Sequence, residues 1–327
     1  MQQMNKHTDS GTSDTSDMRD RVGLAISAIN AASAVANIVA AEAAGVRQVW
    51  STQITGMPDT LSIFAAAAPL TKDVRMGVAI VPLYPIHPLV LAQQALTFHD
   101  LAPGRLRLGI GPSHRTAIEG VYGIEMGNPI EHLREYMAVL RPLVWEGKVD
   151  YQGRFYRVKA QLPRAARTPI LVSALRTGAF RVAGEISDGA ISWMCPPAYL
   201  IERALPALRS GAAESGRPTP PLVAHVPVAF TKDRQALLAA AQKQVGRYGR
   251  MTFYANMFSD AGFPVQPDGS ISEELIDSLV VSGDEAEVAE RLLNLLSSGL
   301  DELLVYNISV SDPDAEIKRL MNLVGQL

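Results

Sequence analysis

Cysteine is almost missing from this chain, which contains one, Cys195, among 327 residues. A single thiol excludes an internal disulfide framework and any metal site built from several cysteines. Histidine is also scarce, and although His132 lies between Glu131 and Glu135, these residues do not form the HExxH zinc pattern. The sequence therefore predicts no metal site, and its lone cysteine fits a reducing, cytoplasmic location.

An excess of one charge sign is absent too, since 30 basic residues face 33 acidic ones, with a formal net charge of -3. This balance excludes the basic surface expected of a nucleic-acid or membrane-surface binder. The most apolar stretch, residues 25–44, is interrupted by Asn30, Asn37 and Glu42. It has the pattern of a strand followed by a helix, so no membrane span is predicted.

The N-terminal segment Met1–Asp20 is polar and rich in Ser, Thr, Asp and Gln. It lacks the apolar centre of a signal peptide and the arginine bias of a transit peptide. We therefore expect a disordered leader over residues 1–20 and one folded domain over residues 21–327.

Hydrophobic residues make up 47% of the chain, enough for a large core, and short apolar runs alternate with longer helical patterns. This alternation is typical of βα units around a parallel sheet. The predicted strands are Val22–Ser27, Gln48–Ser51, Val74–Val81, Leu106–Ile110, Pro169–Ser173, Gly189–Trp193, Leu222–Ala229 and Glu302–Tyr306. The predicted helices are Ala31–Ala44, Pro88–Leu101, Glu131–Trp145, Gly178–Ile186, Pro197–Ala213, Arg234–Tyr248 and Glu285–Ser298. Eight strands favour a single (β/α)8 TIM barrel over a doubly wound sheet, which would need about six.

Two segments interrupt the alternation. Lys148–Val158 alternates in character around Gly153, as a β-hairpin does. Gly249–Ser272 has glycines and prolines but little periodicity. Because long irregular loops in compact domains are often functional, we expect this one to cover an active site at the C-terminal mouth of the barrel. A flexible loop without this role is the alternative.

Three segments carry a family resemblance. They are His87–Arg115 (HPLVLAQQALTFHDLAPGRLRLGIGPSHR), Glu131–Val158 (EHLREYMAVLRPLVWEGKVDYQGRFYRV) and Leu171–Ile191 (LVSALRTGAFRVAGEISDGAI). The first joins a His-Pro helix start to a Gly-Arg turn and a Gly-x-Gly strand end, and the last ends in Ala-Gly-Glu and Asp-Gly. In order and spacing they resemble the luciferase-like monooxygenase superfamily, specifically its branch that uses the deazaflavin coenzyme F420.

The resemblance implies a cofactor lying across the C-terminal strand ends, with its ring beside a bulge in the third strand. Counting back from the His-Pro helix start, the non-prolyl cis peptide of the family corresponds to Ala79–Ile80. An ordinary strand with a packed core is the alternative. The expected ring-binding residues are Ala79, Ile80 and Val81.

Phosphate is expected at the helix start after the fifth strand, where backbone N–H groups can bind an anion. The residues there are Ser173, Ala174, Leu175, Arg176 and Thr177. Many relatives have Leu-Gly-Pro where this chain has Leu175-Arg176-Thr177. The change loses a glycine but adds a guanidinium and a hydroxyl, both able to bind phosphate. A solvated loop arginine is the alternative for Arg176.

Gly109 and Gly111 end the fourth strand, where glycines let a ring or side chain come close. His114 stands where a dinucleotide fingerprint would have its third glycine, so a Rossmann site is not indicated. His114 is a catalytic candidate that can orient the ring or donate a proton, with a structural hydrogen-bonding role as the alternative. Gln53 is the second catalytic candidate, at a position where several F420 enzymes resembling this chain have an acid–His pair.

Candidates for substrate contact follow other strands at the predicted mouth. They are Ser27, Tyr122 and Trp193, with Tyr122 or water as further proton sources and packing in the barrel as the alternative. Cys195 is expected to be a buried thiol, and His87 a structural hydrogen-bonder.

The function expected from the resemblance is F420-dependent hydride transfer, reducing a C=C, C=N or C=O bond in a secondary metabolite or modified peptide. One alternative is an FMN-dependent luciferase-like monooxygenase, and another is a non-catalytic flavin-binding protein. The expected partners are a small-molecule or peptide substrate and, because relatives are often dimers, a second copy of the chain.

Overall fold

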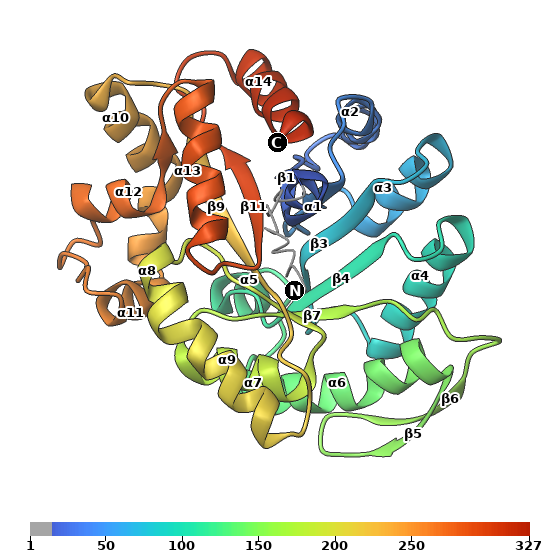
Figure 1. Ribbon diagram of the computed structural model, residues 1–327. Coiled ribbons are helices and arrows are strands. Elements are labelled where there is room, and N and C mark those ends of the chain that lie inside the picture. The colour runs from blue at the N-terminus through green and yellow to red at the C-terminus, as the bar shows by residue number, and fades with distance from the viewer. Residues whose placement is uncertain (1–14) are drawn as a thin grey trace, which may run out of the picture.

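A closed barrel of eight parallel strands forms the centre of the protein (Figure 1). The computed structural model describes residues 15–327. The strand order is β9-β11-β1-β2-β3-β4-β7-β8, and pairing of β8 with β9 closes the ring. The strands are β1 Val22–Ala25, β2 Gln48–Ser51, β3 Arg75–Pro82, β4 Leu106–Gly111, β7 Ile170–Ser173, β8 Gly189–Ile191, β9 Leu222–Ala229 and β11 Glu302–Asn307. The predicted (β/α)8 barrel is confirmed, and each predicted strand lies within about two residues of an observed one.

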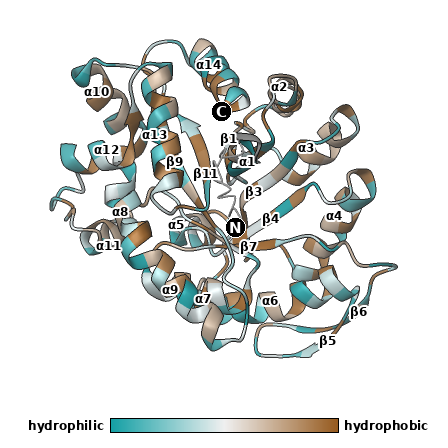
Figure 2. Cartoon of the chain, viewed as in Figure 1, coloured by the Kyte–Doolittle hydropathy of each residue, from teal (hydrophilic) through white to brown (hydrophobic). Residues whose placement is uncertain are grey.

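Helices surround the barrel, hydrophobic toward the strands and more hydrophilic outside (Figure 2). They are α2 Ala31–Ala43, α3 Thr60–Ala67, α4 Pro88–Leu101, α5 Arg115–Gly120, α6 Pro129–Glu146, α7 Thr177–Ile186, α8 Pro197–Tyr199, α9 Leu205–Glu214, α10 Arg234–Val245, α13 Glu285–Ser297 and α14 Pro313–Gln326. A π-helical segment, Leu200–Ala204, joins α8 to α9. Side chains cap several helix starts; Asp284 on α13 forms a capping box with Glu287. The prediction missed α3, α5 and α14.

Residues 15–20, which we expected in the leader, form most of a short helix, α1 Thr15–Arg21, that leads directly into β1. Residues 1–14 lie outside the described part of the chain. The helix is fastened by Arg21, whose guanidinium donates to the carbonyls of Leu300 and Asp301 at 2.7 Å each. These bonds to the segment before β11 hold α1 against the folded domain, although its polar composition predicts a leader.

Side chains fill the middle of the barrel. Trp50 on β2 is 1% exposed and lies over the neighbouring strands at Gly23 and Gly77. A Cβ atom on either glycine would stand 2.3–2.4 Å from the Trp50 ring, so both positions require glycine for this packing. Trp50 packs with Val223 and Leu304 from the opposite side of the ring of strands. The barrel is therefore a packed core rather than a pore.

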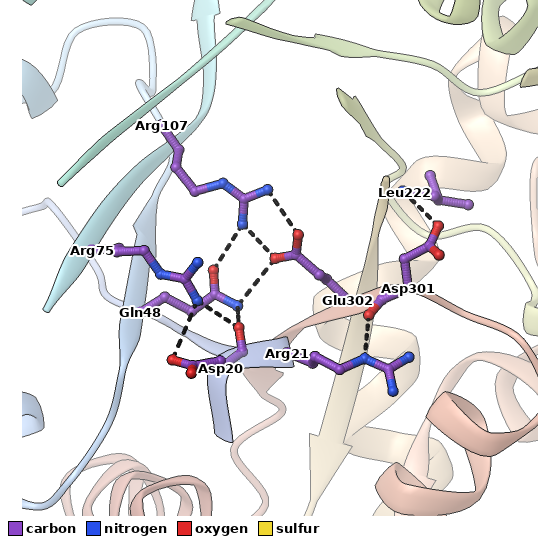
Figure 3. Close-up of polar contacts among 8 residues, drawn as sticks. All are labelled: Asp20, Arg21, Gln48, Arg75, Arg107, Leu222, Asp301 and Glu302. Carbon is purple, nitrogen blue, oxygen red and sulfur yellow. Dashed lines mark hydrogen bonds and ion pairs between the residues drawn. The ribbon is translucent and has the colours of Figure 1, made fainter. Parts of the chain in front are cut away.

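The N-terminal ends of the strands are closed by a polar network (Figure 3). Arg107 on β4 forms two hydrogen bonds to the carboxylate of Glu302 on β11 and a third, of 2.9 Å, to Gln48 on β2. Gln48 and Arg75 in turn donate to the carbonyl of Asp20 at 3.1 and 2.6 Å. The network ties five elements (α1, β2, β3, β4 and β11) together at the floor, which leaves the opposite end of the barrel for function.

Two insertions depart from the simple repeat. Between β4 and β7, strands β5 Lys148–Gln152 and β6 Arg157–Gln161 form the predicted hairpin, which docks on α6 because Glu135 accepts backbone N–H groups of Arg154 and Phe155 at 2.9 Å. The second lies between β9 and β11 and contains the 3-10 segment η3 Gly246–Arg250, α11 Thr252–Asp260, α12 Glu273–Leu279 and the short strand β10 Val281–Ser282.

The prediction that residues 249–272 lack regular structure is wrong for α11. Its buried residues Tyr254, Met257 and Phe258 follow helical spacing, but the flanking glycines and prolines hid so short a pattern. Residues 261–272 contain no helix or strand, as expected. Over residues 15–327, no helix has the length and apolar character to span a membrane, and no cluster of potential metal ligands occurs.

Candidate active site at the barrel mouth

The third strand carries the predicted irregularity at its C-terminal end. Pairing between β3 and β4 shifts register between Val78 and Val81, and the Ala79–Ile80 peptide bond is cis. The expected bulge is therefore confirmed. Ala79 is 5% exposed and belongs to the interior cluster, against which Ile80 packs. The bulge thus lies at the top of the packed interior.

The glycines that end β4 serve this bulge. A Cβ on Gly109 would stand 2.0 Å from the carbonyl oxygen of Val78, and one on Gly111 would stand 2.0 Å from Oγ of Ser173. These glycines are predicted to let a ring or a side chain come close, and in the structure the carbonyl of Val78 and the side chain of Ser173 lie beside them. Their immediate role is to let β3 and β7 approach β4 closely.

The start of α7 presents donors without a protein acceptor. Its N-cap residue, Arg176, provides no side-chain cap, and Thr177 and Gly178 follow on the exposed surface. Arg176 Nε donates to the carboxylate of Asp260 on α11 at 2.6 Å. The buried hydroxyl of Tyr199 has no hydrogen-bond partner among the described residues.

Tyr199, the last residue of α8, lies near the start of α7. Burial raises the pKa of Tyr199 to about 12, with further influence from Cys195, Asp260, the backbone of Thr177 and Arg176, which surround the hydroxyl. A neutral hydroxyl beside uncapped N–H groups and a guanidinium is a donor set suited to an anion such as phosphate. Sequence reasoning missed Tyr199, because it follows β8 rather than β7.

An aromatic group lies beside this site, after β8 and on the next strands of the ring, β9 and β11. Trp193 stacks on His225 of β9, with ring centroids 3.6 Å apart and planes at 25°, and its Nε1–H donates to the hydroxyl of Tyr248 at 2.8 Å. Tyr306 of β11 lies 5.6 Å from the His225 ring. His225 and Tyr306 come two residues after the interior residues Val223 and Leu304. Because strand side chains alternate, both rings point into the barrel one layer nearer its mouth.

His225 is the most unusual group in this layer. It is 2% exposed, and neither ring nitrogen has a hydrogen-bond partner among the described residues. Burial lowers the pKa of His225 to about 3, so the imidazole is neutral at pH 7. A buried donor and acceptor without partners are expected to bind water or a ligand group.

His114 lies near this layer from the β4 side. It precedes α5, its side chain caps no helix, and its ring centroid stands 5.8 Å from that of Tyr254 on α11. Burial and then the charge of Arg247 lower the pKa of His114, so the imidazole favours the neutral form. Tyr254 also lies 4.6 Å from Tyr248. The segment 246–260 therefore lies against the loop after β4, consistent with the predicted cover.

The remaining predicted residues are less closely joined to this group. Gln53 uses its side-chain oxygen to accept the N–H of Thr60 at 2.7 Å at the start of α3, which leaves its amide nitrogen for another partner. Ser27 is exposed just beyond β1, and Tyr122, 37% exposed, follows α5. Trp193 alone of the predicted substrate residues joins the aromatic group.

Residues expected to be structural are so. His87 accepts the N–H of Leu89 at 3.2 Å as the N-cap of α4, and Cys195 is 2% exposed. His132 lies 2.6 Å from the hydroxyl of Tyr156 and stacks on Phe155.

Sequence reasoning missed Arg247, Tyr248, Tyr254, His225 and Tyr306. A signal existed for His225, since it is a polar residue at an inward position of an apolar strand. For the residues of η3 and α11 no local signal exists, because only the fold of the insertion brings them to the mouth.

Comparison with known proteins agrees with this architecture. Residues 8–302 match the family described as luciferase-like monooxygenase. A 5,10-methylenetetrahydromethanopterin reductase of Methanopyrus kandleri is 24% identical over 326 residues, covering 88% of this chain and 91% of that protein.

Solved structures show the same fold. An F420-dependent secondary alcohol dehydrogenase superimposes with a TM-score of 0.78 at 18% identity, covering 93% of this chain and 97% of that one. The FMN-bound oxygenating constituent of 3,6-diketocamphane monooxygenase from Pseudomonas putida superimposes with a TM-score of 0.72 at 18% identity, covering 94% and 97%. By its match over residues 8–302, this chain belongs to the luciferase-like monooxygenase family.

Proposed function

We propose that this protein is an F420-dependent oxidoreductase that transfers hydride between the deazaflavin and a C=C, C=N or C=O bond of a small-molecule or peptide substrate. The observation that carries the proposal is the start of α7, which has no side-chain cap and where Arg176 and the backbone of Thr177 lie near the buried hydroxyl of Tyr199. The relative named as a methylenetetrahydromethanopterin reductase and the F420-dependent alcohol dehydrogenase support the deazaflavin.

The donors at α7 fit the phosphate of such a cofactor. A phosphate there would accept N–H groups of the first turn and the Tyr199 hydroxyl, and would share Arg176 with Asp260. Its ring would then extend over the bulge at Ala79–Ile80. Bound F420 supplies two-electron hydride chemistry, which asks of the protein alignment, exclusion of water and a proton source.

The residues at the mouth are suited to alignment, exclusion of water and proton donation. The rings of Trp193 and Tyr248, joined by a hydrogen bond, form a rigid wall against which a planar substrate can be aligned. Tyr254 and the rest of α11 exclude water from the β4 side. His114 is the proton donor we assign, because it lies half-buried at the mouth and its neutral imidazole still has a ring N–H to donate.

An FMN-dependent monooxygenase is the second candidate, favoured by the similar fold of the diketocamphane monooxygenase with FMN. Both cofactors carry a phosphate, so the α7 site alone does not separate them. The chemistry does, because reduced FMN reacts with oxygen whereas the deazaflavin is a poor oxygen activator.

The test is a side-by-side measurement of the dissociation constants of F420 and FMN, by fluorescence titration of the purified chain. We expect F420 to bind at least about tenfold more tightly, a difference of about 1.4 kcal/mol. FMN binding as tight as F420 would contradict the proposal. Tight F420 binding without oxidation of reduced F420 by any member of a carbonyl, imine and alkene panel would instead support a non-catalytic flavin-binding protein.

Variants at Arg176 and Tyr199 test whether the phosphate binds at the start of α7. Arg176→Gln and Tyr199→Phe should each weaken F420 binding roughly 10-fold, the loss expected for one hydrogen bond to a charged group. Arg181→Gln is the control, since Arg181 is exposed on the same helix and pairs with Glu214 away from its start. Equal affinity in all three variants would remove α7 from the site.

A further inference from the structure

Arg247 on η3 brings a positive charge to the mouth without a carboxylate to neutralise it. Its guanidinium lies over the ring of Tyr248, 5.1 Å from the centroid, and donates to the Tyr248 hydroxyl at 3.3 Å. No ion pair to Arg247 occurs within residues 15–327. Arg176, by contrast, is paired with Asp260.

The surroundings of Arg247 come from opposite sides of the barrel. The groups that feel its charge are His114, which follows β4, Tyr306 on β11, and Tyr254 on α11. In the ring of strands, β4 and β11 are separated by β1, β2 and β3. A cation that influences both sides must therefore lie over the mouth, not on the outer wall.

None of these neighbours cancels the charge. Burial raises the pKa of both Tyr254 and Tyr306, so the two phenols are neutral at pH 7. His114 is held toward its neutral form, and its own protonation would add to the positive charge. The mouth therefore combines one uncompensated cation with an aromatic wall, a setting that attracts a planar anion.

We propose that the substrate of this enzyme carries a carboxylate or phosphate group, which Arg247 binds while the attached apolar part packs against Trp193 and Tyr248. The inference rests on the proposed function for its chemistry, but the anion site itself requires no cofactor. Because the guanidinium is planar and always charged, it can grip either oxyanion with two parallel hydrogen bonds. The unpartnered nitrogens of His225 lie beneath Trp193 in the same wall.

The test uses two pairs of probes, each with an anionic and a neutral aromatic member: benzoate with benzamide, and phenyl phosphate with phenol. Binding to the full chain is measured by isothermal titration calorimetry, without cofactor and again with saturating F420. We expect the charged member of at least one pair to bind at least about tenfold more tightly than its neutral partner. This is the difference in affinity typical of one charge-assisted hydrogen bond. Which pair shows the preference separates carboxylate from phosphate.

Arg247→Gln should abolish the preference for the charged probe, whereas Arg250→Gln, an exposed arginine on the same segment, should leave it unchanged. Affinity of the charged probe for the unmodified chain should also fall with added salt while that of the neutral probe does not, a check that needs no variant. Near-ultraviolet circular dichroism verifies that each variant is folded.

Three results would overturn the inference. They are equal affinity for charged and neutral probes, an undiminished preference in Arg247→Gln, and weaker F420 binding in that variant, which would assign Arg247 to the cofactor. Failure of the proposed function has a different signature, because F420 would then bind poorly to the unmodified chain while the charged probes still bind it.

Discussion

At the scale of single residues, His225 shows how the barrel changes the chemistry of a side chain. An exposed imidazole titrates near neutral pH, but here the ring is buried between Trp193 and Tyr306 with both nitrogens unpartnered. Protonating His225 in this buried position costs free energy in the folded state but not in the unfolded chain. The residue therefore links the stability of the fold to pH.

The sign of that link follows from the pKa values. The pKa of His225 falls from 6.5 to about 3 on folding, so below pH 6.5 the unfolded chain binds a proton that the folded chain does not. Stability should therefore decline as pH falls from 6.5 toward 3, by up to about 1.4 kcal/mol per pH unit from this residue. His225→Phe should reduce this decline, measured as the urea unfolding free energy between pH 7 and 5. An identical pH dependence in variant and parent would contradict the assignment.

Gly109 carries a second prediction at this scale. Its missing side chain makes room for the carbonyl oxygen of Val78 at the start of the β3 bulge. Gly109→Ala should destabilise the protein by about 1–3 kcal/mol, because the obstacle is backbone that cannot move aside cheaply. Gly120→Ala is the control, since nothing lies within 4 Å of a Cβ there. Chemical denaturation measures both, and equal stabilities would show that the bulge yields easily.

At the scale of elements, the position of α7 depends on its contact with α9. The two helices approach so closely that a Cβ on Gly184 would stand 2.1 Å from the carbonyl oxygen of Leu208, and one on Gly211 would stand 1.9 Å from that of Arg181. Glycine at both positions lets backbone meet backbone. The contact determines where the start of α7, and so the proposed phosphate site, lies.

Gly211→Ala should therefore both destabilise the protein, by about 1–3 kcal/mol, and weaken F420 binding several-fold by displacing α7. Thermal unfolding and fluorescence titration measure the two effects. Gly178→Ala on α7 is the stability control, because its Cβ meets open space. A destabilised Gly211→Ala protein with unchanged F420 affinity would separate the helix contact from the site.

At the scale of the whole molecule, the two ends of the barrel have different tasks. The floor contains the Arg107–Glu302 pair, with side chains only 11% and 14% exposed, and the mouth contains partnerless polar groups. A paired network suits stability, and unsatisfied groups suit a ligand.

Removing one partner of the Arg107–Glu302 pair should destabilise the fold more than replacing both partners with apolar residues. Glu302→Leu leaves Arg107 buried without a counter-charge and should destabilise the fold by about 3–5 kcal/mol, whereas Arg107→Met with Glu302→Leu should recover much of the loss. Urea unfolding at pH 7 measures the cycle, with Asp150→Asn in the exposed Lys159–Asp150 pair expected to leave the midpoint unchanged. A double variant as unstable as the single one would show that the pair itself, not the unpaired charge, matters.

Much of this architecture can be predicted from the sequence because the βα unit repeats along the chain. The runs that became the eight barrel strands are apolar and short, and their alternation with amphipathic stretches predicts the barrel. The bulge at Ala79–Ile80 and the phosphate site at Ser173–Thr177 came from a family resemblance, and of these the bulge is confirmed. Caps such as Asp284 also act through residues close in the chain, so the start of α13 depends on local sequence.

The polar character of the mouth was decided by tertiary structure. Arg247 and Tyr254 lie far from His114 in the chain, and only closure of the barrel and folding of the η3–α11 insertion bring them near it. Periodicity determines which face of an element is buried, so the sequence alone established strands, helices and their order. The charge, burial and partners of a side chain depend on what packs against it from elsewhere, and that information exists only in the folded chain.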